Sequence, residues 1–244
     1  MKRKFAVFDI DGTLFRSGLY REVFYELYKM GVVPSNLADE ITAKHSEWRH
    51  RAHDNAFEEF EKVMTDSIDS YLPKLRIADY DTAVQRVLEK KAENVYVYTR
   101  NLIKRLKAEG YFIMAISGSQ QELVEPFAKQ YGFDTWVGQQ WERGEEFFTG
   151  TIVKTHTGKE KIVKHLMTEH DLTLKDSYGV GDTNGDSGML GLVENPIAFN
   201  PTYELLEKAL EHDWKIVIER KNTSYELVKD AHSGHRILEK ANQQ

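Results

Sequence analysis

At 244 residues the chain has room for one large domain, or for a core with a smaller insert. Its apolar share of 41%, with 12 Phe and 12 Tyr, excludes disorder throughout, and the absence of cysteine excludes disulfides, thiolate metal sites and cysteine nucleophiles. The 33 basic and 39 acidic residues give a formal net charge of −6, which argues against a nucleic-acid partner because such proteins bind phosphates through basic clusters.

The N-terminal residues lack the pattern of an export or membrane signal. The basic residues 2–4 precede an apolar run of only four residues, 5–8, which is too short for the apolar part of a signal peptide. No stretch of the sequence approaches the roughly 20 apolar residues that span a bilayer. We therefore expect a cytoplasmic protein without a membrane partner.

The first predicted strand covers residues 5–10 and ends at Asp11-Gly12-Thr13. From residue 19 to about residue 88 the apolar residues recur at helical spacing, and no strand is predicted. This stretch interrupts the core as an insert would. We expect an all-helical cap domain at residues 18–88.

The remaining sequence alternates between helical and strand patterns. The predicted elements are a helix at 83–107, strands at 111–116 and 136–137, a helix at 120–131, a hairpin at 140–153, a helix at 159–170, strands at 177–180, 196–199 and 214–218, and a helix at 203–212. Such alternation predicts an α/β fold, a Rossmann-like parallel sheet with helices on both faces. Residues 1–17 and 89–220 are expected to form this core, and residues 221–244 a polar C-terminal extension.

Polar side chains follow three of the predicted strands. They are Asp9 and Asp11 at the first strand, Ser117 and Gly118 after the strand at 111–116, and Asp182 and Asp186 after the strand at 177–180; Lys159 begins the helix before that last strand. Because ligands collect beyond the carboxyl ends of the strands in an open parallel sheet, we expect these residues to share one site.

Carboxylates brought together repel and raise each other's pKa unless a cation lies between them. Mg²⁺ prefers oxygen ligands and keeps waters that a substrate phosphate can replace. With this charge balanced, an Asp can attack phosphorus and form an aspartyl phosphate. Ser117, nearby backbone N–H groups and Lys159 would hold the phosphoryl oxygens, and Asp11 could act as general acid and base.

The same residues resemble the motifs of the haloacid dehalogenase-like (HAD) phosphatases. Their first motif, D-x-D-G-T/S, is similar to residues 9–13, the second to Ser117-Gly118, the third to Lys159, and the acidic fourth to residues 181–186. The helical insert between the first two motifs resembles the type-one cap of the branch that contains phosphoserine phosphatase.

The resemblance implies a magnesium-dependent phosphatase that acts on small phosphorylated metabolites through an aspartyl phosphate. It implies the following roles: Asp9 as nucleophile, Asp11 as general acid/base, Lys159 as catalytic and phosphate-binding residue, Ser117 and Gly118 as phosphate-binding residues, Asp9, Asp11 and Asp182 as Mg²⁺ ligands, and Asp186 as support for the metal shell.

Three positions depart from the phosphoserine phosphatases. Gly18 stands where their cap carries a Glu for the substrate ammonium, Met64 where an Arg binds the substrate carboxylate, and Gly185 where the fourth motif has an Asn. Phosphoserine is therefore not the favoured substrate.

Other activities stay open from sequence. A phosphotransferase or mutase could use the same phospho-aspartate, and a non-catalytic protein could bind a phosphorylated ligand; a dehalogenase is disfavoured because Asp11 is present. Histidines 45, 50 and 53 lie five and three residues apart, which is not the spacing of a helical metal-binding pair, so surface or substrate-pocket roles are expected for them.

Overall fold

A computed structural model describes residues 2–155, 158–229 and 236–243. The chain forms two compact units. The core unit comprises Met1–Gly18, Ala92–Gln139 and Lys154–Gln244, and the inserted unit comprises Leu19–Lys91 and Gln140–Val153. Within the described ranges, no helix is both long enough and apolar enough to cross a membrane.

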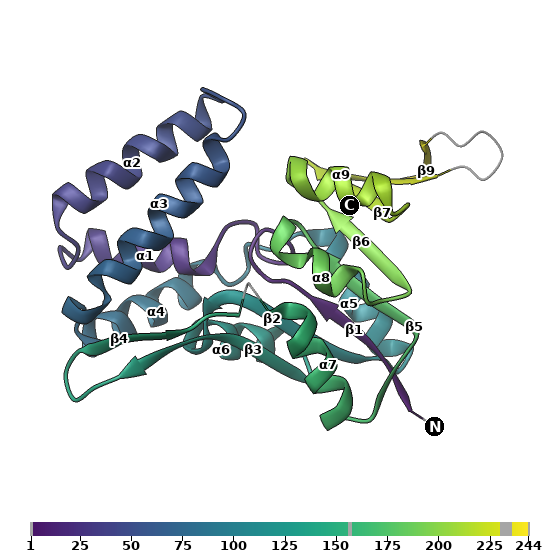
Figure 1. Ribbon diagram of the computed structural model, residues 1–244, viewed down its shortest axis with the longest axis horizontal. Coiled ribbons are helices and arrows are strands. Elements are labelled where there is room, and N and C mark those ends of the chain that lie inside the picture. The colour runs from purple at the N-terminus through teal and green to yellow at the C-terminus, as the bar shows by residue number, and fades with distance from the viewer. Residues whose placement is uncertain (1, 156–157, 230–235, 244) are drawn as a thin grey trace. The chain divides into compact units, whose positions relative to one another are not determined.

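The core unit is built on one sheet (Figure 1). Its strands are β1 (Arg3–Phe8), β2 (Phe112–Gln120), β3 (Thr135–Arg143), β5 (Leu172–Gly181), β6 (Asn195–Phe199), β7 (Lys215–Arg220), β8 (Thr223–Lys229) and β9 (Arg236–Gln243). They lie in the order β3-β2-β1-β5-β6-β7-β8-β9. The pairs from β3 to β7 are parallel, and β8 and β9 add antiparallel strands at the edge.

Helices cover both faces of this sheet (Figure 1). They are α5 (Val97–Ala108), α6 (Gln121–Tyr131), α7 (Lys159–Glu169), α8 (Ser187–Leu190) and α9 (Tyr203–Glu211), with a 3₁₀ turn at Asn184–Asp186. Apolar side chains of α7 and α8 pack against Phe5 and Val7 of β1, while α5 and α6 lie on the opposite face. Residues Phe5–Phe8 of β1 are all buried and apolar, as expected where both faces of a parallel strand are covered. The predicted α/β fold is confirmed.

The inserted unit consists of four helices and a hairpin. The helices are α1 (Leu19–Lys29), α2 (Ser35–Arg49), α3 (Ala56–Tyr71) and α4 (Ile77–Lys91), with a 3₁₀ turn at Leu72–Lys74, and the hairpin joins the end of β3 to β4 (Phe148–Val153). Helix α1 packs on α4, and α2 packs on α3. Phe60 and Met64 are fully buried between these helices.

The hairpin lies in a different unit from the one that the sequence analysis gives it. The sequence predicts residues 140–153 as part of the core, but they group with the inserted helices. The reason is an aromatic cluster, in which the Trp141 and Phe148 rings each lie 5.3 Å from the ring of Tyr80 on α4. The inserted unit is therefore helical apart from this hairpin.

Two predicted element boundaries also differ. The helix expected at 83–107 is divided into α4 and α5. Two backbone hydrogen bonds, from Tyr96 N to Leu14 O and from Arg16 N to Asn94 O, hold the residues between the two helices beside the loop after β1. The sequence predicts a polar extension at residues 221–244, but β8 and β9 continue the sheet. Polar residues of β8 are buried there, including Ser224 and Glu226.

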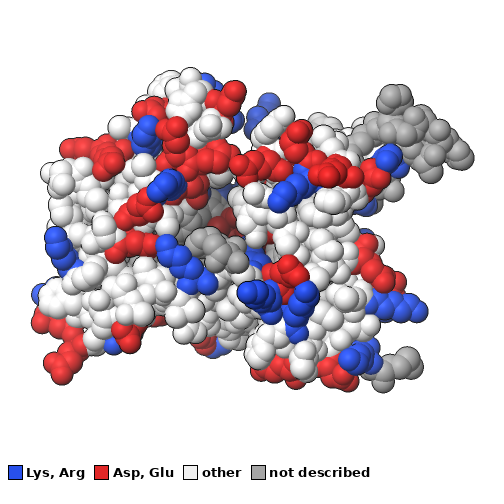
Figure 2. All heavy atoms as spheres, in the orientation of Figure 1, with Lys and Arg blue, Asp and Glu red and all other residues white. Residues whose placement is uncertain are grey.

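Acidic and basic side chains are interspersed on the face of the molecule drawn in Figure 2. This mixing is what the nearly balanced counts of acidic and basic residues lead one to expect.

Candidate active site

The predicted polar residues of the core unit meet at one edge of the sheet. Asp9 directly follows β1, Ser117 lies near the end of β2, and Asp182 directly follows β5. These three strands are parallel neighbours, so their carboxyl ends share one edge. The backbone joins here as well, since Asp9 N donates to Val180 O at 2.9 Å.

Lys159 lies between two carboxylates at the start of α7. Its Nζ donates to Asp9 Oδ1 at 2.5 Å and to Asp186 Oδ1 at 2.6 Å. All three side chains are buried, with exposed fractions of 5%, 7% and 0%. Burial alone would lower the pKa of Lys159, but the carboxylates of Asp186 and Asp9 outweigh it and raise that pKa above its usual value. The ammonium is therefore charged throughout the neutral range.

The three buried carboxylates carry more negative charge than Lys159 can balance. Oxygens of Asp9, Asp182 and Asp186 lie within 4.8 Å of one another. Burial raises the pKa of Asp9 although Lys159 opposes it, and burial together with Asp9 and Asp186 raises the pKa of Asp182. When all three are ionised, the carboxylates and the one ammonium leave two negative charges, and an all-oxygen donor set of this charge fits Mg²⁺, which would keep them ionised.

Asp186 is committed to N–H donors on both oxygens. Oδ1 accepts from Lys159, while Oδ2 accepts from the backbone N–H groups of Asp182 at 3.0 Å and Thr183 at 3.1 Å. The turn is tight, because a Cβ on Gly181 would lie 2.4 Å from the Cβ of Asp186. Asp186 thus orients Lys159 and the Asp182 backbone, in keeping with a supporting position.

Asp11 and Ser117 are joined directly. Ser117 Oγ donates to Asp11 Oδ2 at 2.6 Å and accepts from Ser119 N at 2.9 Å, with Gly118 between these two serines. The Asp11 carboxylate therefore contacts Ser117, whereas the oxygens that converge in the cluster above belong to Asp9, Asp182 and Asp186.

Two threonines that the sequence analysis did not single out support this edge. Thr13 Oγ1 donates to Asp182 Oδ1 at 3.1 Å, and Thr155 Oγ1 donates to the Ser117 carbonyl at 2.5 Å. Thr155 is only 4% exposed although it lies in the segment before α7. Thr13 belongs to the first motif and so carried a signal, whereas a lone Thr outside the motifs carries none.

A sequence model of the haloacid dehalogenase-like hydrolases matches residues 6–191. A histidinol-phosphatase from Neisseria meningitidis serogroup C is 25% identical over 225 residues, covering 88% of this chain and 98% of that protein. A phosphoserine phosphatase from Mycobacterium tuberculosis is 27% identical over 113 residues, covering 45% of this chain and 28% of that protein.

Solved structures share the fold. A phosphoserine phosphatase solved as an analogue of its phospho-aspartyl intermediate superposes with a TM-score of 0.64 at 22% identity, covering 91% of this chain and 95% of that one. A protein of unknown function from Bordetella pertussis Tohama I gives a TM-score of 0.67 at 20% identity, covering 90% and 99%. The structural likeness supports the fold, and the matched sequence model covers about three quarters of the residues. This chain belongs to the haloacid dehalogenase-like hydrolase family.

Proposed function

We propose that this protein is a magnesium-dependent phosphatase that hydrolyses small phosphomonoesters in two steps, through a phosphoryl group carried on Asp9. The observation that carries the proposal is the buried arrangement of Asp9, Lys159 and Asp186, with Asp182 beside them. It combines the Asp9 carboxylate, directly after β1, with the Lys159 ammonium and with more negative charge than this ammonium balances. Membership of a hydrolase family and two relatives named as phosphatases support the same activity.

The residues present fit a Mg²⁺ ion. Asp9 and Asp182 would hold it, together with Asp11, for which the family motif implies a backbone carbonyl ligand. When bound, the ion supplies positive charge that offsets the carboxylates and the phosphate. Asp186 supports the site through Lys159 and the Asp182 backbone.

In the first step a carboxylate oxygen of Asp9 bonds to phosphorus while the bond from phosphorus to the ester oxygen breaks. Asp11 gives a proton to the departing oxygen, which leaves as an alcohol. Lys159, Ser117 and the backbone N–H of Gly118 hold the phosphoryl oxygens, over which the transition-state charge is spread.

In the second step water attacks the phosphorus of phospho-Asp9. Asp11 accepts a proton from this water, inorganic phosphate leaves, and the Asp9 carboxylate is regenerated. The Ser117–Asp11 hydrogen bond of 2.6 Å supports these roles, because the proposed acid/base and the proposed phosphate-binding residue are neighbours.

The substrate class that we propose is the phosphate ester of a small alcohol bearing a nitrogen group. Histidinol phosphate ranks above phosphoserine for two reasons. The relative named histidinol-phosphatase matches over nearly its whole length. Met64, at the position expected for a carboxylate-binding Arg, is fully buried, and histidinol phosphate has no carboxylate.

The test is phosphate release from an aryl phosphate, histidinol phosphate and phosphoserine, with Mg²⁺ and then with a chelator. We expect activity with Mg²⁺, its loss on chelation, and a loss on the order of 10⁴-fold or more in Asp9→Asn, because the nucleophile is removed. Asp171→Asn is the matched control, since Asp171 is exposed and its left-handed backbone (φ 51°) suits Asn.

The outcomes separate the alternatives. Activity that survives in Asp9→Asn would contradict the nucleophile assignment. Transfer of phosphate to an added alcohol in preference to water would identify a phosphotransferase instead. Binding of phosphate without turnover of any ester would support a non-catalytic protein.

A further inference from the structure

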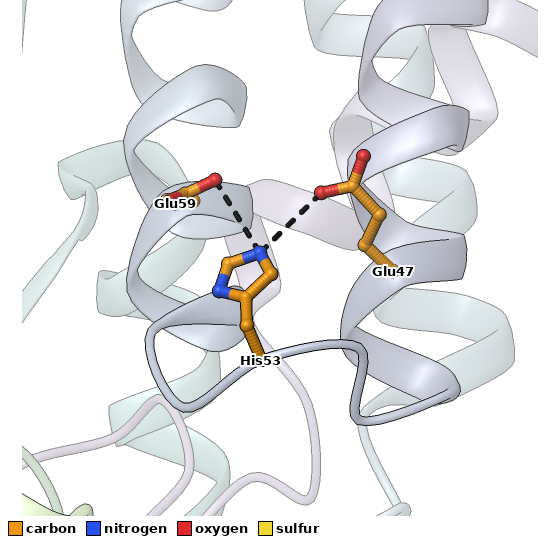
Figure 3. Close-up of side chains that lie close together, drawn as sticks. All are labelled: Glu47, His53 and Glu59. Atoms are coloured by element: carbon orange, nitrogen blue, oxygen red, sulfur yellow. Dashed lines mark ion pairs between the residues drawn. The ribbon is translucent and has the colours of Figure 1, made fainter.

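The inserted unit contains a second group of metal-ligating side chains, made entirely of its own residues. Glu47 lies in the last turn of α2, His53 in the loop that follows, and Glu59 in the first turn of α3. Figure 3 shows the imidazole of His53 reaching up from the loop, with its ring nitrogen directed between the two carboxylates.

The donor atoms have the spacing of a small coordination site. His53 Nε2 lies 3.6 Å from Glu47 Oε2 and 3.7 Å from Glu59 Oε2, and the three atoms all lie within 4.8 Å of one another. Tetrahedral ligands with bonds of about 2.0–2.2 Å are roughly 3.3–3.6 Å apart. The two distances from the imidazole nitrogen to the carboxylate oxygens are therefore within a few tenths of an ångström of this spacing.

A cation already occupies the point on which the two carboxylates converge. Lys44 Nζ lies 2.8 Å from Glu47 Oε2 and 2.9 Å from Glu59 Oε2, the same two oxygens that face His53. A divalent ion that displaces this ammonium keeps both carboxylates and gains the imidazole nitrogen. Lys44 is 30% exposed and its long side chain can turn outward to water.

We propose that Glu47, His53 and Glu59 form a binding site for a zinc-type divalent metal ion, with water completing its coordination. One imidazole nitrogen with two carboxylate oxygens is a donor set that zinc accepts, whereas Mg²⁺ favours oxygen alone. The bound ion would fasten α2 to α3 at the loop that joins them. The site is independent of the phosphatase activity proposed above.

The histidines alone could not reveal this site. Their mutual spacing excludes a helical pair, but only one histidine takes part, and its partners are glutamates six residues away on either side. The α2–α3 turn brings these three together, while His50 bonds to Ser46 instead, with Nδ1 2.8 Å from the Ser46 carbonyl oxygen.

The experiment is a calorimetric titration of the full-length protein with Zn²⁺ in saturating Mg²⁺, which is added to fill the magnesium site proposed for the core. His53→Ala and Glu59→Gln remove one ligand each, and His50→Ala is the matched control in the same loop. Lys44→Met removes the competing ammonium and leaves every proposed ligand in place. Circular dichroism checks that each variant is folded, as expected because His50, His53 and Glu59 are exposed and Lys44 is half-buried.

We expect the wild type and His50→Ala to bind one Zn²⁺ at this site with similar affinity. His53→Ala and Glu59→Gln should bind it with an affinity about tenfold lower or worse. Lys44→Met should bind this Zn²⁺ more tightly than the wild type, because nothing must be displaced. Equal Zn²⁺ affinity and stoichiometry in the wild type and His53→Ala would overturn the proposal. So would weaker binding in Lys44→Met, or an equal loss in His50→Ala.

Discussion

The backbone at Gly12 passes directly beside Asp182 in a left-handed conformation. Its φ is +83°, and a Cβ at this position would lie 2.0 Å from Asp182 Oδ2. A side chain here therefore meets two obstacles, the backbone strain and the carboxylate. Gly31, at φ +73°, has the strain without the obstacle, because no atom lies within 4 Å of the place of its Cβ.

This pair gives a prediction about Asp182. Gly12→Ala should displace the Asp182 carboxylate and reduce phosphatase activity on the order of 100-fold, the cost of a displacement of about 1 Å at a reacting centre. Gly31→Ala should cost about 1–2 kcal/mol of unfolding free energy and leave the rate unchanged. Steady-state kinetics with urea unfolding of both variants is the measurement, and equal activity in the two would contradict the geometry.

Thr155 makes a second prediction at this scale. Thr155→Val removes the donor to the Ser117 carbonyl at nearly constant volume, which costs about 1–3 kcal/mol at a buried acceptor. If the lost hydrogen bond lets Ser117 move, we expect kcat/KM to fall roughly tenfold, because about 1.4 kcal/mol of lost transition-state stabilisation corresponds to a factor of ten. Thr155→Ser keeps the hydroxyl and should restore the rate. A Thr155→Val enzyme with wild-type kinetics would show that the bond does not position Ser117.

Single residues differ in how far sequence could reveal them. Asp9, Ser117, Lys159 and Asp182 were identifiable because each stands at or near the end of a strand, or at the start of a helix, in a pattern of fixed order. Thr155 was not, because its burial depends on a contact 38 residues away in the chain. Their catalytic roles stay predictions.

At the scale of elements, α5 shows how distant segments support a helix. Its N-terminus has no cap from a neighbouring side chain. Instead the carboxylate of Glu219, on β7 and 4% exposed, accepts from Val97 N at 3.2 Å and Tyr98 N at 2.9 Å. A carboxylate at this end also interacts favourably with the helix dipole.

Glu219→Ala should therefore lower the free energy of unfolding by about 1–3 kcal/mol, since two partly buried N–H groups lose their acceptor. Glu219→Gln keeps an acceptor and should lose less. Glu207→Ala, at an exposed position of α9, is the control and should change stability by about 0.5 kcal/mol or less. Urea unfolding measures all three, and equal stability of Glu219→Ala and the control would refute the capping role.

Sequence patterns predicted the core strands more reliably than the connections. Strands β1 and β2 contain apolar runs followed by polar residues, so local sequence marks them. Strand β5 begins at Leu172, before the strand predicted at 177–180, because its first half is polar and partly exposed and carries no such run. The break between α4 and α5 and the grouping of the hairpin with α4 depend on pairing with Leu14 and packing on Tyr80. These partners are distant in the chain, so the local sequence does not identify them.

At the scale of the whole molecule, the sheet of the core unit is completed by the C-terminal strands. Strand β8 pairs with β7 from Thr223 to Leu227, and Glu226 lies 3.1 Å from Lys215 across the pair. The polar composition of β8 predicts a peripheral tail, but β8 lies between β7 and β9, and a strand can bury polar residues that find partners.

A chain truncated after Lys221 should therefore lose stability. The truncation exposes one side of β7 and leaves its backbone groups unpaired, which we expect to lower the free energy of unfolding by several kcal/mol. Each kcal/mol lowers Tm by about 2–4 °C in a protein of this size. Differential scanning calorimetry of the truncated and full chains measures this. An unchanged Tm would show that β8 and β9 contribute nothing to the core.

The central claim is that phosphate passes through a covalent bond to Asp9. Turnover of a substrate in Mg²⁺, quenched with borohydride, reduces an aspartyl phosphate to homoserine, and mass spectrometry of the peptide that contains residues 5–16 locates it. We predict homoserine at position 9, dependent on substrate. Phosphate release without this product, or with the modification at Asp11 or Asp182, would contradict the account.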